Sequence, residues 1–121
     1  MEYIKINDEY FHGTSEKTLA RIEEIVSKQG KDNYYLTFLN NPKEAHKKAV
    51  IEAQGTQSRR AIIYINNGKF PVKKNNELEI LISLNTIWQE LYRNRLIRLY
   101  GGGEIRIYSE DEMEIFESIF L

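Results

Sequence analysis

The segment from residue 34 to residue 55 constrains the fold most, because it places a strand pattern directly before a helix start. Residues 34–39 read Tyr-Tyr-Leu-Thr-Phe-Leu, an aromatic and apolar run typical of a β-strand. Asn41-Pro42-Lys43-Glu44 follows at once and supplies a cap residue, a proline in the first turn and a glutamate that reaches back. The helix should end by Gly55. Strand and helix in such close succession indicate a domain that contains both.

The first third of the chain repeats this strand-then-helix order. Residues 3–6 and 9–12 are predicted to be short strands, with Gly13-Thr14-Ser15 as a turn. Either Thr14 or Ser15 can cap a helix that buries residues 19, 22, 25 and 26 and stops at Gly30.

The second half is richer in strands. Strands are predicted at 61–65, 78–82 and 104–108, with a turn at residues 66–68. Residues 85–93 favour a short helix, and residues 95–100 suit either a helix or a strand. Ser109 and Glu112 form the pattern of a capping box for a final helix, in which Met113, Phe116 and Phe120 share one face. These elements predict one α+β domain over residues 1–121.

Composition excludes several classes of protein. The 121 residues contain no cysteine, which rules out disulfides, thiolate metal sites and a cysteine nucleophile. The two histidines form no zinc-binding pattern, so we expect no metal. The net charge of −1 argues against a nucleic-acid partner. No apolar run is long enough for a signal peptide or a membrane span, so we expect a cytoplasmic protein without a membrane partner.

Three short motifs carry residues suited to chemistry. Phe11-His12-Gly13-Thr14-Ser15 places a histidine and a glycine at a strand end, and Tyr34-Tyr35-Leu36-Thr37 precedes the helix that starts at Asn41. Gly103-Glu104-Ile105-Arg106-Ile107-Tyr108 follows two further glycines and places a carboxylate at the start of a late strand. Each motif alone is common in ordinary cores and strand ends. Their order is what distinguishes the chain.

That order resembles the His-Tyr-Glu class of ADP-ribosyltransferases, which includes the poly(ADP-ribose) polymerase catalytic domains and small bacterial and phage enzymes. The resemblance covers residue 12 to the end of the chain. It implies a split β-sandwich with short flanking helices and NAD as the co-substrate.

The resemblance also assigns roles to individual residues. His12 would hold a ribose hydroxyl of NAD, and Gly13 and Thr14 would lie beside the nicotinamide. Tyr35 would stack on the nicotinamide ring. Glu104 would stabilise the positive charge that develops on the ribose and activate the acceptor. His12, Tyr35 and Glu104 are thus expected to converge on one cleft.

Some details depart from the family pattern or stay open. Tyr34 is the alternative to Tyr35, because adjacent strand residues point to opposite faces. Lys48 occupies the expected place of a second stacking ring, for which Trp88 could substitute. Arg59 or Arg60 could contact the NAD pyrophosphate or the target.

The implied function is transfer of ADP-ribose from NAD to a macromolecular acceptor, preferentially a protein. The resemblance further suggests a bacterial or phage toxin or host-takeover effector, for which an antitoxin or inhibitor protein would be a partner. The alternatives are a non-catalytic interaction module on the same fold and an NAD hydrolase. RNA 2′-phosphotransfer is disfavoured, because it normally uses more histidine and arginine than these motifs offer.

Overall fold

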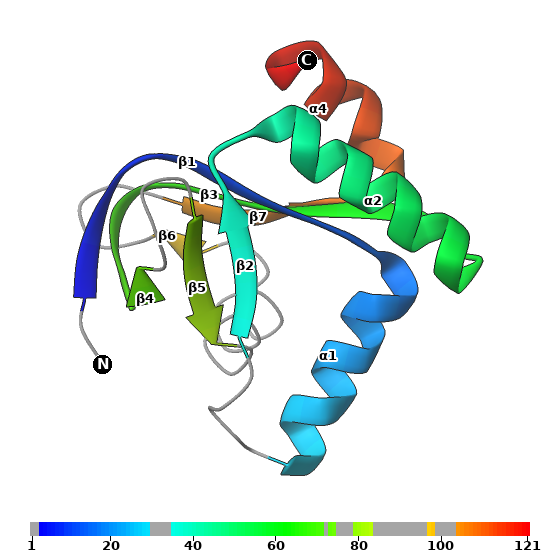
Figure 1. Cartoon of the computed structure of the whole chain (residues 1–121), viewed down its shortest axis with the longest axis horizontal. Coiled ribbons are helices and arrows are strands. Elements are labelled where there is room, and N and C mark those ends of the chain that lie inside the picture. Colours follow the sequence, from blue (N-terminus) through cyan, green and yellow to red (C-terminus); the bar gives the residue numbers. More distant parts are fainter. Residues whose placement is uncertain (1–2, 30–34, 72, 75–78, 84–96, 99–103) are drawn as a thin grey trace.

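The computed structural model describes residues 3–29, 35–71, 73–74, 79–83, 97–98 and 104–121 (Figure 1). Its helices and 3₁₀ turn are α1 (Glu16–Gln29), α2 (Pro42–Thr56), η2 (Glu110–Glu112) and α4 (Met113–Phe120). Its strands are β1 (Tyr3–Ser15), β2 (Tyr35–Leu39), β3 (Arg60–Pro71), β4 (Lys73–Lys74), β5 (Glu79–Ser83), β6 (Ile97–Arg98) and β7 (Glu104–Tyr108).

The described strands form one sheet in the order β4-β5-β2-β1-β3-β7-β6, and every neighbouring pair is antiparallel. In Figure 1, α2 and α4 lie above the β1–β3–β7 part of the sheet, and α1 extends below it. The β2–β5 part turns steeply away from the β1–β3–β7 part (Figure 1). The predicted α+β class is confirmed.

The long β1–β3 ladder corrects three sequence predictions. The segments 3–6 and 9–12 belong to one strand, which is interrupted only by a register shift between Ile6 and Glu9. The expected turn at Gly13-Thr14-Ser15 is the last part of the same strand. The expected turn at residues 66–68 lies inside β3, where Gly68 pairs with Ile6. In each case a paired neighbour strand overrides the local turn preference.

Helix α2 begins as its sequence predicts and ends one residue later than expected. Asn41 caps it, because its side-chain oxygen accepts from the backbone N–H of Glu44 at 3.2 Å. Gly55 is still helical, and the reversal falls on Gln57, which has φ 52° and ψ 47°. The backbone N–H groups that follow the helix satisfy its last carbonyls, so a left-handed residue other than glycine closes it.

The other two predicted helices are also present. Ser15 rather than Thr14 caps α1, accepting from the N–H of Thr18 at 3.3 Å. Ser109 precedes η2 and makes no side-chain cap bond to the backbone, and its hydroxyl lies 3.4 Å from the carboxylate of Glu112 instead. The predicted capping box is therefore wrong in its contacts, although the helix follows as expected.

The main core lies between the sheet and the α2–α4 layer. It is built from residues of β1, β3, β7, α2 and α4, namely Phe11, Ala45, Ala49, Ile62, Tyr64, Tyr108, Met113 and Phe116, with Phe120 packed against it. On α1, Leu19 and Ile22 are buried as predicted. This core fixes the register of the central strands, and the register decides which side chains can meet.

Several predictions fall outside the described residues. They concern Gly30, Tyr34, the helix at 85–93, Gly101-Gly102-Gly103, and all of 95–100 except the two residues of β6. In the described ranges, no helix combines the length and the apolar character needed to span a membrane.

Candidate functional site

His12 lies in β1 with its imidazole turned toward β2. Its Nδ1 is 2.7 Å from the main-chain oxygen of Thr37, and its ring centroid is 5.5 Å from that of Phe38. The pKa of His12 is lowered overall, and burial is the largest cause. The Lys48 ammonium also lowers this pKa, whereas the Thr37 hydrogen bond and the Glu52 carboxylate raise it. The imidazole is therefore neutral at pH 7, with Nδ1–H donating to the carbonyl. Nε2 is left as an acceptor, and no described residue bonds to it.

The strand ladder between β1 and β2 stops at this point. Phe11 and Leu39 are its paired residues, and the register continued by two residues would pair Gly13 with Thr37. That pair does not form. The carbonyl of Thr37 instead accepts from the His12 side chain, so an imidazole takes a position that the backbone of Gly13 would take in a regular sheet.

The backbone of Gly13 faces the edge where the ladder stops. From Glu9 to Ser15, β1 pairs with β3 in one continuous register. The next pair in that register is Glu16 with Arg59, and there the N–H of Glu16 donates to the carbonyl of Arg59 at 2.9 Å. Even-numbered residues of this part of β1 therefore direct their N–H and C=O groups toward β3, and odd-numbered residues direct theirs toward the opposite edge. Gly13 presents one donor and one acceptor at an edge where it has no paired residue in β2.

The absence of a side chain at Gly13 has a structural cause. A Cβ there would lie 1.8 Å from the carbonyl oxygen of Ala45 and 2.8 Å from the nitrogen of Ala49. The glycine thus lets α2 press directly on β1. On this face of β1, the backbone of α2 approaches Gly13 closely, in the place where the sequence analysis expected a ligand.

Thr14 carries a buried hydroxyl without a partner. The residue is 1% exposed, and its Oγ1 has no hydrogen bond in the described structure. Two residues apart on one strand, Thr14 and His12 lie on the same face of the sheet. An unpaired buried hydroxyl costs free energy, so it is a feature that needs an explanation.

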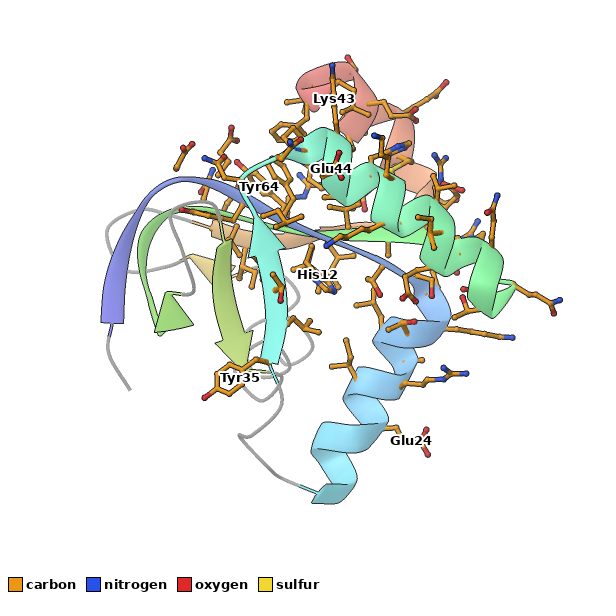
Figure 2. The ribbon with its side chains drawn as sticks, viewed as in Figure 1. His12, Glu24, Tyr35, Lys43, Glu44 and Tyr64 are labelled. Atoms are coloured by element: carbon orange, nitrogen blue, oxygen red, sulfur yellow. The ribbon has the colours of Figure 1, made fainter. Side chains whose placement is uncertain are left out.

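Tyr35 lies apart from His12. It is the first residue of β2 and is 41% exposed, and Figure 2 shows its ring at the far end of that strand from His12. Strand alternation puts Tyr35 on the face opposite Phe38, whereas the His12 ring lies beside Phe38. In this structure Tyr35 and His12 do not meet. The alternatives Tyr34 and Trp88 lie outside the described residues.

Glu104 lies on the opposite face of the sheet from His12. Asn66 pairs with Glu104, and Tyr64, two residues before Asn66 on the same face, packs in the core under α4. His12 instead pairs with Ile63, whose side chain points to the other face. The expected convergence of His12, Tyr35 and Glu104 on one cleft is therefore absent from the described structure, because the register of β1, β3 and β7 separates them.

Glu104 belongs instead to a hydrogen-bonded group that the sequence analysis missed. Its backbone N–H donates to the side-chain oxygen of Asn66 at 3.0 Å, and the Asn66 amide donates to the hydroxyl of Tyr64 at 2.7 Å. Tyr64 in turn donates to the carboxylate of Glu9 at 2.5 Å. Burial, with the Glu9 hydrogen bond, raises the pKa of Tyr64. In the sequence, the i, i+2 spacing of Tyr64 and Asn66 indicates that both side chains share one face of a strand. The sequence alone does not show that β1 and β7, which carry Glu9 and Glu104, are the neighbours of that strand.

The two arginines considered for phosphate contact are paired with acids. Arg59 bonds Glu16 and Asp111, and the Arg60 guanidinium bonds Glu110 at 2.7 Å and lies 3.0 Å from Nε2 of His46. Both guanidinium groups are thus held by acidic side chains in the described structure.

The described part of the chain contains no group of three or more histidine or acidic side chains that could hold a metal ion. Comparison of the chain with protein-family models, characterised proteins and solved structures found no match.

Proposed function

We propose that this chain is an NAD-dependent ADP-ribosyltransferase, which cleaves the nicotinamide–ribose bond and passes ADP-ribose to a macromolecular target, preferentially a protein. One observation carries the proposal. At the point where the β1–β2 ladder stops, Nε2 of His12 and Oγ1 of Thr14 have no hydrogen-bond partner in the described structure, and Gly13 between them has no paired residue in β2.

These groups match the chemistry of the nicotinamide half of NAD. A carboxamide offers one acceptor and two donors, and the N–H and C=O of Gly13 are complementary to it. A neutral imidazole whose Nδ1–H is already bonded can accept a ribose hydroxyl at Nε2. The Thr14 hydroxyl would gain the partner that it lacks. The steep turn between the two parts of the sheet is compatible with the split β-sandwich of the resembling family.

The positions of the other two expected residues favour a second candidate function. Glu104 and Tyr35 do not lie beside His12, and a carboxylate on the far face of the sheet cannot stabilise a charge that develops at the ribose. A module that binds NAD without transferring ADP-ribose needs only the His12–Thr14 contacts. An NAD hydrolase would share the site and would use water as the acceptor.

Incubation with NAD labelled in the ADP-ribose part and a cell lysate separates these functions. Transfer predicts label on macromolecules together with free nicotinamide. Nicotinamide without labelled macromolecules indicates hydrolysis, and bound but intact NAD indicates the module. Absence of NAD binding contradicts the proposal. If transfer occurs, an antitoxin or inhibitor protein becomes the partner to search for.

A Glu104→Gln variant tests the carboxylate directly. Glu104 can be the catalytic carboxylate only if NAD binding brings it to the ribose, and in that case Glu104→Gln loses turnover while NAD affinity stays within about twofold, because the substitution removes charge without changing size. Glu114→Gln, on the exposed face of α4, is the matched control. Unchanged turnover in Glu104→Gln would reject Glu104 as the catalytic residue.

A further inference from the structure

Lys48 lies on the turn of α2 that packs against Gly13. The two atoms of α2 that a Cβ at Gly13 would meet belong to Ala45 and Ala49, which bracket Lys48 in the helix. Ala45 and Ala49 are fully buried, whereas Lys48 is exposed on the flank of the helix. This position brings its backbone next to the strand edge where the β1–β2 ladder stops.

The flank that carries Lys48 is turned toward α1. Glu52, one helical turn after Lys48, accepts a hydrogen bond from the hydroxyl of Thr18 at 3.1 Å. The opposite flank carries His46, which contacts Arg60 and Glu117 on the α4 side. Lys48 and Glu52 are also the charged groups that act on the His12 imidazole. The Thr18 contact places Lys48 on the α1 flank of α2, and its charge acts on His12 across the edge of β1, although α2 itself packs on the face of that strand opposite His12.

Several cationic side chains near Lys48 are paired with acids, whereas Lys48 forms no ion pair within the part of the chain that the structure describes. Lys47 lies 3.5 Å from the carboxylate of Glu44, and Arg59 and Arg60 each bond an acidic side chain. Among the described residues, no acidic group forms an ion pair with Lys48. Its ammonium can therefore meet an anionic ligand without first breaking a protein contact.

We propose that Lys48 binds the diphosphate of NAD and so makes this site selective for phosphate-bearing ligands over the free nicotinamide riboside. The inference rests on the proposed function, since it takes NAD as the ligand of His12, Gly13 and Thr14. The chemistry is that of a flexible ammonium against phosphate oxygens, which tolerates imprecise geometry better than a planar guanidinium does. The nearby Glu52 carboxylate accepts a hydrogen bond from Thr18 and forms no ion pair with Lys48 in the described structure. Its negative charge lowers the affinity of the site for phosphate but leaves the Lys48 ammonium available.

The test compares three ligands on the full chain: NAD, nicotinamide mononucleotide and nicotinamide riboside. Affinities are measured by calorimetry for the wild type, Lys48→Gln, Lys48→Arg and the control Lys47→Gln. Lys48→Gln should weaken NAD binding by about 3- to 10-fold, the range for an exposed to partly desolvated ionic contact, and leave nicotinamide riboside unchanged. Lys47→Gln should bind all three ligands like the wild type, and Lys48→Arg should retain most of the NAD affinity.

Salt dependence supplies a second readout. The NAD affinity of the wild type should fall more steeply with ionic strength than that of Lys48→Gln. Equal NAD affinity in the wild type and Lys48→Gln overturns the role of Lys48 and leaves the proposed function standing. An equal loss for nicotinamide riboside also overturns it, because the effect would then not depend on phosphate. A wild type that binds none of the ligands overturns the inference and the proposed function together.

Discussion

The imidazole of His12 donates from Nδ1 to the main-chain carbonyl of Thr37 across 2.7 Å. This contact replaces the next backbone pair of the β1–β2 ladder, which would join Gly13 to Thr37. It also fixes the tautomer of the ring, so Nε2 is the acceptor. A side chain that interrupts a sheet in this way both costs ladder hydrogen bonds and leaves polar groups available to a ligand.

The lowered pKa of His12 predicts a loss of stability in mild acid. The folded state keeps His12 neutral, whereas the unfolded state binds its proton near the ordinary pKa of about 6.5. The unfolded state thus binds more protons below that pH, and the free energy of unfolding falls as the pH decreases, by at most about 1.4 kcal/mol per unit. Urea unfolding at pH 7.5 and pH 5.5 measures it.

The His12→Asn variant is the control for this pH dependence. Its free energy of unfolding should change less between the two pH values than that of the wild type, because the buried titrating group is gone. All other titratable groups are the same in the two proteins and cancel in the comparison. An identical pH dependence in the two proteins would show that His12 is not held neutral.

Gly13→Ala is predicted to destabilise the fold strongly. The new Cβ would meet the backbone of α2 at 1.8 Å, and neither the strand nor the helix can yield without losing core contacts. The expected cost is about 3 kcal/mol or more, at the upper end for overpacking. Chemical denaturation gives the value.

Gly55→Ala is the matched substitution at an open position. No atom lies within 4 Å of its Cβ site, and Gly55 is helical. Alanine there should stabilise the protein by about 0.5–1 kcal/mol, because glycine loses more backbone freedom in a helix. Similar effects at both positions would contradict the packing of α2 on Gly13.

Tyr64→Phe should destabilise the protein by about 1–2 kcal/mol, since it leaves Glu9 and the Asn66 amide without their shared partner. Tyr108→Phe is the control in the same core. Its hydroxyl makes no hydrogen bond to the described residues, and its loss should cost less than about 0.5 kcal/mol. Equal costs for the two variants would argue against the Glu9–Tyr64–Asn66 group.

Local patterns predicted the elements whose signals lie within a few residues. The bounds of β7 and the Asn41 cap of α2 are as expected, because alternation and capping depend on neighbours in sequence. The turn predicted at residues 66–68 was wrong, because its Asn and Gly residues pair with β1 over a long sequence separation.

The separation of Glu104 from His12 has the same origin. The sequence indicates that Glu104 starts a strand, but its face depends on the register of β7 against β3 and of β3 against β1. A shift of one residue in either ladder would turn Glu104 to the face of His12. The unpaired Thr14 hydroxyl and the role of Gly13 beneath α2 could not be predicted either, because both depend on the distant packing of β2 and α2.

The central claim is that His12, Gly13 and Thr14 bind NAD where the β1–β2 ladder stops. Calorimetric titration of the wild type and of His12→Phe with NAD tests it most directly, with circular dichroism to establish that the variant is folded. The wild type should bind NAD, and the folded variant should lose at least about tenfold in affinity, because phenylalanine keeps the ring and removes the Nε2 acceptor. Equal affinity in the two proteins, or no binding by the wild type, would contradict the claim.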